Sequence, residues 1–264
     1  MAEVERAHNR IYYADRGAGE PVLFVHGYPL NSSLWDPQVE ALEGSYRCLV
    51  PDLLGFGRSD APEDLDLYSV EAYAADLLSV MDDAGVNDAT VCSLSMGGYI
   101  AFALVRSAPE RIRALILADT RAEPDGDEGW ASRTAQQELI RAQGTAPVID
   151  SMVTGPLLSD ATRASKPDVV ERTRRIMDNP APGFLGALEA MKKRPDSTRT
   201  LARINVPTLF LVGEHDAITP PGVAREMHAA VPGSRLVVIP DAGHLSNLES
   251  PGAFNGATLE LLGS

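Results

Sequence analysis

Six short apolar runs recur along the chain, and none of them shows the polar alternation of a half-exposed strand. They occupy residues 21–27, 46–52, 88–95, 112–119, 206–216 and 234–244. Strands that are hydrophobic on both faces are typical of a parallel sheet covered by helices. Residues 69–85 and 97–111 have helical spacing, with Ser69 as the expected N-cap and Gly85 as the end of the first helix. Residues 10–17 alternate enough to predict an antiparallel edge strand, and the whole pattern predicts a doubly wound α/β sheet.

One long segment, from Arg121 to Arg203, breaks this alternation because it contains no convincing strand. Its sequence is typical of short helices separated by proline and glycine. An insertion between two strands of such a sheet lies at the carboxyl edge, where ligands bind in these folds. We therefore expect a core domain of residues 1–120 and 204–264 and a helical cap of residues 121–203. A plain pair of crossover helices is the alternative interpretation, although roughly 80 residues are long for that role.

The charge and the cysteine content of the chain limit its partners. The formal net charge of −14 repels nucleic-acid phosphates and anionic lipid headgroups, so we expect a small-molecule partner, with neither nucleic acid nor membrane. Cys48 and Cys92 lie in apolar runs and are expected to be buried free thiols. Charges near the N-terminus and the lack of a long apolar run predict a cytoplasmic protein. No sequence feature decides between a monomer and a homodimer.

The sequence VCSLSMGG, residues 91–98, places a strand, an abrupt turn and a helix in immediate succession. Such a turn forces its central residue into a strained backbone conformation and exposes the side chain above the sheet. Small residues near the turn let the strand and the helix approach closely. Ser95 meets this requirement through Gly97 and Gly98, whereas Ser93 does not. Ser95 is therefore the candidate nucleophile, and a helix N-cap is the alternative role for its hydroxyl.

A serine hydroxyl becomes a nucleophile when a histidine accepts its proton and a carboxylate orients that histidine. Of the five histidines, His244 lies in the loop after the last apolar run, at the sheet edge expected for Ser95. We therefore predict that His244 is the base. Structural or solvent-exposed positions are expected for the others, which are His8, His26, His215 and His228.

The predicted orienting carboxylate is Asp216, which ends an apolar run and precedes a turn. Asp119, which ends another apolar run, is the second candidate, and Glu214 and Asp241 rank below it. The order Ser, Asp, His along the chain is one of the known arrangements of a catalytic triad.

Five motifs along the chain carry a resemblance to a known family. They are LFVHGYPLNSSLWDPQ (23–38), PDLLGFGRSDAP (51–62), LSMGG (94–98), VGEHDAITPP (212–221) and DAGHLSNLESP (241–251). Together they resemble the α/β-hydrolase fold family, in the branch of serine carboxylesterases, lactonases and cofactor-free haloperoxidases. The resemblance covers essentially the whole chain and implies a mostly parallel eight-stranded sheet, flanked by helices, with a small helical cap inserted after strand 6. It also implies an oxyanion hole made by the backbone N–H groups of Tyr28 and Met96.

The resemblance and the three candidate side chains imply a carboxylesterase that cleaves small to medium, largely apolar esters through an acyl-enzyme. A lactonase, of the acyl-homoserine-lactone or enol-lactone type, would use the same residues, as would a perhydrolase or haloperoxidase. A ligand receptor on a hydrolase scaffold is a remote alternative. Ser95 argues against a dehalogenase or epoxide hydrolase, because those enzymes use an aspartate nucleophile on this fold. The sequence has no motif for a metal or nucleotide cofactor, so none is expected.

The cap residues expected to line the substrate pocket are apolar. They are Trp130, Leu158, Phe184, Leu185 and Leu188, with Met152, Leu157 and Met191 as further apolar members. Packing between cap and core is the alternative role for each of them. A mostly apolar pocket favours uncharged esters. The basic run of residues 192–194 is predicted to be a solvent-exposed helix face.

One position departs from the family pattern Gly-x-Ser-x-Gly, because Ser93 stands where the first glycine is expected. A serine adds a Cβ atom and a hydroxyl at the most crowded point of the turn. Serine is small, and alanine is tolerated there in some relatives, so we expect the turn to form.

Overall fold

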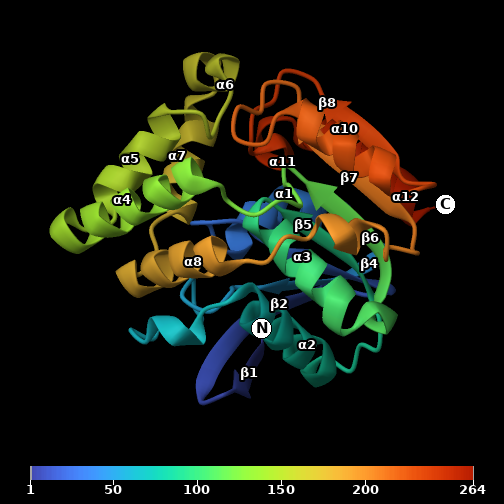
Figure 1. Ribbon diagram of the computed structural model, residues 1–264. Helices are drawn as coiled ribbons and strands as arrows, with labels where there is room; N and C mark the ends of the chain where they lie inside the picture. The colour runs from blue at the N-terminus through green and yellow to red at the C-terminus, as the bar shows by residue number, and fades with distance from the viewer. Residues whose placement is uncertain (1, 264) are drawn as a thin grey trace.

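A computed structural model describes residues 2–263, and its centre is a mixed sheet of eight strands (Figure 1). The strands are β1 (Ala2–Arg6), β2 (Asn9–Gly17), β3 (Glu20–Val25), β4 (Tyr46–Pro51), β5 (Ala89–Leu94), β6 (Ile112–Ala118), β7 (Thr208–Gly213) and β8 (Arg235–Ile239). Their order across the sheet is β1-β2-β4-β3-β5-β6-β7-β8. The pairs β1–β2 and β2–β4 are antiparallel, and all later neighbours are parallel. The mostly parallel sheet is thereby confirmed.

The central strands are buried on both faces, which explains their continuous apolar sequences. Every residue of β5 and β7 is buried, and Arg113 is the one exposed residue of β6. The first strand, β1, is an addition to the predicted elements. Its residues alternate between half-buried and exposed positions and three of the five are charged, so the sequence gives little apolar signal.

Helices flank this sheet on both faces. They are α1 (Asp36–Leu42), α2 (Val70–Asp83), α3 (Met96–Ser107), α10 (Pro221–Ala230), α11 (Ser246–Glu249) and α12 (Pro251–Leu262), with short 3-10 turns η1 (Ser32–Trp35), η2 (Leu65–Leu67) and η3 (Pro109–Arg111). The crossovers β3–α1–β4 and β5–α3–β6 run in opposite directions across the sheet, so right-handed connections place α1 and α3 on opposite faces. Helix α2 packs against α3, and α1 packs against α12. The Ser69 hydroxyl accepts the Ala72 N–H at 3.0 Å, which confirms the predicted N-cap of α2.

Between β6 and β7 the chain forms helices. They are α4 (Asp127–Gln143), α5 (Ala146–Thr154), α6 (Asp160–Ser165), α7 (Pro167–Ile176), α8 (Ala181–Lys193) and α9 (Thr198–Leu201). All residues of this segment are described, and none is in a strand, as predicted. Helices α4 to α8 gather to one side of the sheet, and α8 packs against both α4 and the core turn η2 (Figure 1).

The basic run at the end of α8 is a correction to the sequence interpretation. The side chains of Lys192 and Arg194 are only 7% and 3% exposed, and Lys193 alone is largely exposed. Lys192 pairs with Glu189 at 2.9 Å, and Arg194 pairs with Asp125 at 2.9 Å. Buried charges need such partners. Glu189 lies three residues before Lys192 on the same helix, whereas Asp125 is brought to Arg194 by tertiary folding.

Two further predictions concern burial and membranes. Cys48 and Cys92 are both free and buried, as expected. None of the helices within residues 2–263 combines the length and the apolar composition that a bilayer crossing requires.

Candidate functional site

Ser95 occupies the abrupt turn between β5 and α3. Its backbone has φ 55° and ψ −116°, a conformation that residues with a Cβ atom rarely adopt. The two glycines that follow make this turn possible. A Cβ atom at Gly97 would collide with the carbonyl oxygen of Val25, and one at Gly98 would collide with the Thr120 side chain. The strand and the helix therefore meet closely, and the Ser95 side chain projects from the sheet edge.

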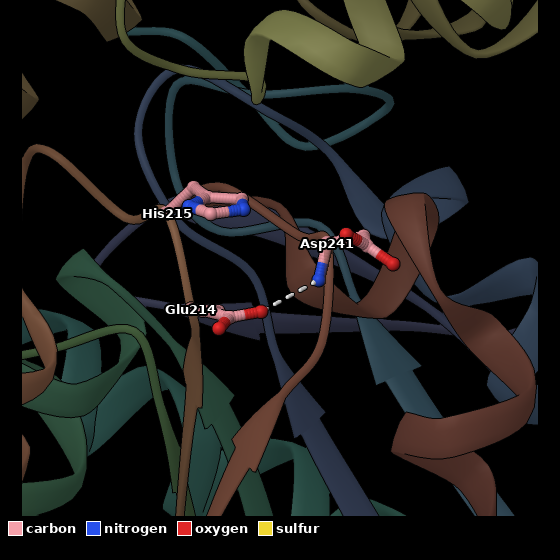
Figure 2. Close-up of side chains that lie close together, drawn as sticks. All are labelled: Glu214, His215 and Asp241. Carbon is pink, nitrogen blue, oxygen red and sulfur yellow. Dashed lines mark hydrogen bonds between the residues drawn. The ribbon is translucent and has the colours of Figure 1, made fainter.

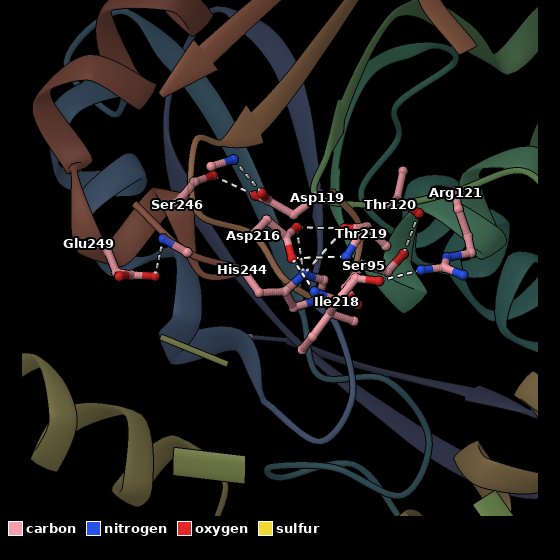
Figure 3. A network of polar contacts seen from close by, with 12 residues as sticks. Ser95, Asp119, Thr120, Arg121, Asp216, Ile218, Thr219, His244, Ser246 and Glu249 are labelled. Atoms are coloured by element: carbon pink, nitrogen blue, oxygen red, sulfur yellow. Dashed lines mark hydrogen bonds and ion pairs between the residues drawn. The ribbon is translucent and has the colours of Figure 1, made fainter. Parts of the chain in front are cut away.

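The three side chains predicted as nucleophile, base and acid lie in one hydrogen-bonded row (Figure 3). Ser95 Oγ is 2.8 Å from His244 Nε2, and His244 Nδ1 is 2.9 Å from Asp216 Oδ2. The Ser95 hydroxyl makes no N-cap hydrogen bond to α3, which removes the alternative role considered for it. His244 and Asp216 follow the carboxyl ends of β8 and β7, so the parallel strands bring all three together.

The surroundings of Asp216 keep it ionised. Its Oδ1 accepts the N–H groups of Ile218 and Thr219 at 2.8 and 2.9 Å, and its Oδ2 accepts the Thr219 hydroxyl at 2.6 Å. Burial alone would raise the pKa of this carboxyl. The attraction of His244 and the hydrogen bonds from His244 and Thr219 outweigh burial and hold the pKa of Asp216 below its ordinary value.

Asp119, the second candidate for the acid, lies beside Asp216 with different partners (Figure 3). Its Oδ1 accepts the Gly213 N–H at 2.8 Å and its Oδ2 accepts the Ser246 hydroxyl at 2.5 Å. Complete burial and the charge of Asp216 raise the pKa of Asp119 well above its ordinary value. Charge is therefore disfavoured on Asp119 and favoured on Asp216, and the carboxylate that contacts His244 is Asp216.

The lower-ranked carboxylates lie in a different place, around His215 (Figure 2). Glu214, His215 and Asp241 are all exposed, and Glu214 Oε2 accepts the backbone N–H of Asp241 at 3.3 Å. Asp216, by contrast, is 3% exposed. An exposed carboxylate is screened by water and orients a histidine poorly.

The remaining histidines have structural or surface positions, as expected. His26 is fully buried after β3, and its Nε2 accepts the Leu53 N–H at 3.0 Å, so its Nδ1 carries the proton and donates to the Gly27 carbonyl at 3.0 Å. Burial lowers the pKa of His26 and keeps the ring neutral. His228 Nδ1 is 2.8 Å from the Ser234 hydroxyl, and the His8 side chain is exposed.

Two backbone N–H groups near Ser95 are available to an oxyanion. Met96 is the first residue of α3, so its N–H has no acceptor within the helix. Tyr28 lies in the loop after β3 and lines the same cavity as Ser95. Within residues 2–263, no loop or turn hydrogen bond joins the backbone N–H of Tyr28 or Met96 to a backbone carbonyl.

A cavity of about 350 Å³ opens beside Ser95 and His244. The inserted segment supplies much of its wall, including Ser132, Arg133, Gln136, Met152, Leu157 and Met191. Met152, Leu157 and Met191 are thus lining residues, as considered from the sequence. The presence of an arginine and several hydroxyl and amide groups makes the wall more polar than expected.

The five residues expected to form the substrate pocket lie elsewhere, and this prediction is corrected. Phe184 and Leu188 are fully buried, and Leu185 is half-buried against the core. Leu158 borders a neighbouring cavity, and Trp130 is 46% exposed. Apolar spacing marks the inner face of a helix, but it does not tell whether that face meets the core or a cavity.

Several polar residues of the site were not predicted. Thr219 follows Asp216 by three residues, and this spacing within a turn is a signal that could have indicated it. Glu249 is buried and accepts the N–H groups of Gly243 and Ser159 at 2.9 and 2.8 Å, so it holds the His244 loop against the insertion. Arg133 has no distinguishing pattern in the sequence, since its place depends on how α4 packs.

Comparison with known proteins gives one family. Residues 20–251 match the model of the alpha/beta hydrolase fold. A 3-oxoadipate enol-lactonase of Acinetobacter baylyi is 30% identical over 234 residues, covering 88% of this chain and 85% of the relative.

Two solved structures are similar over nearly the whole chain. A thermophilic esterase from Thermogutta terrifontis, with malate bound, has a TM-score of 0.92 and 39% identity, covering 96% of this chain and 93% of its own. A bromoperoxidase from Bacillus anthracis has a TM-score of 0.88 and 26% identity, covering 100% and 99%. The strand order, the turn at Ser95 and these matches agree. The chain belongs to the α/β-hydrolase family, in the branch that contains esterases, lactonases and cofactor-free haloperoxidases.

Proposed function

We propose that the protein is a serine hydrolase that cleaves carboxylic esters through an acyl-enzyme intermediate. The observation that carries this proposal is the continuous hydrogen-bonded row from Ser95 through His244 to Asp216 at the wall of a cavity. An ionised Asp216 fixes the proton on His244 Nδ1, which leaves Nε2 free to accept the proton of the Ser95 hydroxyl.

In the proposed mechanism, Ser95 Oγ attacks the acyl carbon while His244 takes its proton. Asp216 stabilises the imidazolium that forms, and the N–H groups of Met96 and Tyr28 bind the negative oxygen of the tetrahedral intermediate. Each such donor lowers the barrier by about 3 kcal/mol. The alcohol leaves with the proton from His244, and water repeats the same steps to release the acid.

We further propose that residues 121–203 act as a cap over this reaction and that residues 1–120 and 204–264 form the core. The insertion supports this role in two ways. Its helix α4 forms part of the cavity wall, and its Leu157 carbonyl accepts the backbone N–H of His244 at 3.2 Å. The cap thus shapes the cavity and also supports the loop of the base.

Lactone hydrolysis is the second candidate, because a relative that covers most of the chain is named an enol-lactonase. A lactone presents the same acyl carbon, and its alcohol stays tethered after ring opening. The proposed residues need no change of role. Parallel assays with a lactone series and an open-chain ester series of equal carbon number decide which substrate has the higher kcat/KM.

The substitution Ser95→Ala tests the nucleophile. It removes the attacking oxygen, so kcat for 4-nitrophenyl acetate is expected to fall by at least about 1,000-fold. Ser93→Ala is the matched control, because it removes the neighbouring serine hydroxyl and is expected to keep turnover within about tenfold of wild type. A fluorophosphonate reacts with a nucleophilic serine at phosphorus and releases fluoride, and mass spectrometry of the product is expected to find the phosphonyl group on Ser95. Turnover by the Ser95→Ala protein at the wild-type rate would refute the assignment.

A further inference from the structure

A buried cation stands in the wall of the Ser95 cavity. Arg133, on α4, lines this cavity with a side chain only 18% exposed. Its Nε and Nη2 atoms bond the carboxylate of Asp125, and Arg194 bonds the same carboxylate at 2.9 Å. Two guanidinium groups thus share one carboxylate, and the cluster of Asp125, Arg133 and Arg194 carries a net charge of +1.

Arg133 is not required to neutralise Asp125, because Arg194 is paired with the same carboxylate. Arg194 is 3% exposed, donates to the Met191 and Glu123 carbonyls as well as to Asp125, and already compensates that charge. The Nη1 atom of Arg133 makes no hydrogen bond to the residues the structure describes. A largely buried guanidinium with an unused edge in a cavity wall is suited to binding an anion.

A hydrogen-bond donor in the same cavity wall also lacks a partner among the described residues. The Tyr28 hydroxyl is buried and makes no hydrogen bond within residues 2–263. The Tyr28 ring is held edge-to-face against Phe184, with the centroids 5.6 Å apart. Burial raises the pKa of Tyr28 and the Arg133 charge opposes that rise, so the hydroxyl stays protonated and lies within the field of Arg133. Burying an unpaired donor costs free energy, which a bound acceptor recovers.

We propose that Arg133 and the Tyr28 hydroxyl bind a carboxylate of the substrate, so the preferred substrates are monoanionic esters or lactones of short dicarboxylic acids. This inference rests on the proposed hydrolase function and names its substrate class. The small cavity places the anion site and Ser95 in one space, so a short chain can join the bound carboxylate to the reacting carbonyl. The expectation of uncharged substrates, drawn from apolar cap residues, is replaced.

Monomethyl and dimethyl glutarate test the proposal, because they differ by one charge and one methyl group. We expect wild type to have a kcat/KM for the monoanion at least about tenfold above that for the diester, per ester bond, measured by proton release at constant pH. In Arg133→Gln the ratio of the two kcat/KM values falls by at least about tenfold, mainly because the KM for the monoanion rises. Tyr28→Phe keeps the backbone N–H and lowers the ratio less, and Arg133→Lys retains part of it.

The matched control is Arg141→Gln, which removes the same charge from an exposed position on the same helix. It is expected to leave the ratio unchanged. Thermal unfolding of each variant shows whether the fold is kept.

A binding measurement separates this inference from the proposed function. Calorimetric titration of wild type with glutarate, in the absence of any ester, is expected to show binding that Arg133→Gln weakens by at least about tenfold. Wild type that hydrolyses 4-nitrophenyl acetate, yet neither binds glutarate nor prefers the monoanion, would refute the anion site alone. Glutarate binding without hydrolysis of any ester would instead refute the hydrolase.

Discussion

At the scale of single residues, Ser93 shows how the turn accepts a side chain where the family pattern has glycine. Its hydroxyl is fully buried and donates to the Ile116 carbonyl of the neighbouring strand β6 at 3.2 Å. The hydroxyl is therefore satisfied within the sheet and is not among the groups that line the Ser95 cavity. Ser93 acts as a strand residue beside the nucleophile.

Ser93→Gly is expected to keep the fold and to preserve or raise esterase turnover, because no group of the site contacts this hydroxyl. The variant loses one hydrogen bond and gains backbone freedom in a strand, so its free energy of unfolding falls by about 1–2 kcal/mol. Urea denaturation and 4-nitrophenyl ester kinetics measure the two effects. Complete loss of turnover in a folded variant would reveal a catalytic role for the Ser93 hydroxyl.

At the scale of elements, the ends of two adjacent parallel strands bring two carboxyl groups together. Asp119 follows β6 and Asp216 lies in the loop after β7, and the backbone N–H of Asp119 donates to the Leu211 carbonyl at 2.9 Å. Their environments then divide their roles. Asp216 gains hydrogen bonds that favour its charge, while burial and the charge of Asp216 raise the pKa of Asp119.

This division predicts different outcomes for two equivalent substitutions. Asp216→Asn removes the charge that fixes the His244 tautomer, so kcat is expected to fall by at least about 1,000-fold. Asp119→Asn keeps the shape of a side chain that makes no hydrogen bond to His244, so kcat is expected to fall by less than about tenfold. Steady-state kinetics of both variants on one ester compare them. Equal losses would mean that Asp119 is ionised and shares the role of Asp216.

At the scale of the whole molecule, an ion pair fastens the edge of the sheet to a helix of the core. Arg6 of β1 bonds Asp76 of α2 and also donates to the Ala72 carbonyl at 3.0 Å. The Asp76 side chain is 4% exposed, and its Oδ2 has no partner among the described residues. Burial outweighs the attraction of Arg6 and raises the pKa of Asp76 to about 6.

Asp76 therefore makes the stability of the molecule depend on pH. Between pH 3.8, the ordinary pKa of the group, and about 6, the folded state holds a proton that the unfolded state has lost. The free energy of unfolding thus falls by an amount on the order of 3 kcal/mol as pH rises through this window. Above the window, Asp76 contributes no further change with pH.

The amide side chain introduced by Asp76→Asn cannot titrate. The unfolding free energy of wild type minus that of this variant is therefore expected to decrease from about pH 4 to about pH 7. Guanidinium denaturation of both proteins at several pH values measures this difference. Asp82→Asn, at an exposed position of the same helix, controls for the loss of one negative charge from α2. A difference that stays constant across the window would contradict the prediction.

Local sequence pattern is sufficient to predict the strands, the turn at Ser95 and the loops that carry His244 and Asp216. Continuous apolar runs predicted the parallel strands, because only strands covered on both faces are apolar throughout. The serine followed by two glycines predicted the turn at Ser95, because that backbone leaves no room for a Cβ atom two and three residues later. The loops after the strands indicated His244 and Asp216, since parallel strands end at one edge.

Tertiary structure alone decided which inserted side chains face the cavity and which charges are buried. Arg133 and Tyr28 meet at one wall because α4 packs against α8 and Tyr28 against Phe184 of α8, and no spacing in the sequence encodes those contacts. Phe184 and Leu188 turn to the core instead of the cavity for the same reason. Local pattern fixes which face of a helix is apolar, but the surface that meets that face is set by residues far apart in the chain.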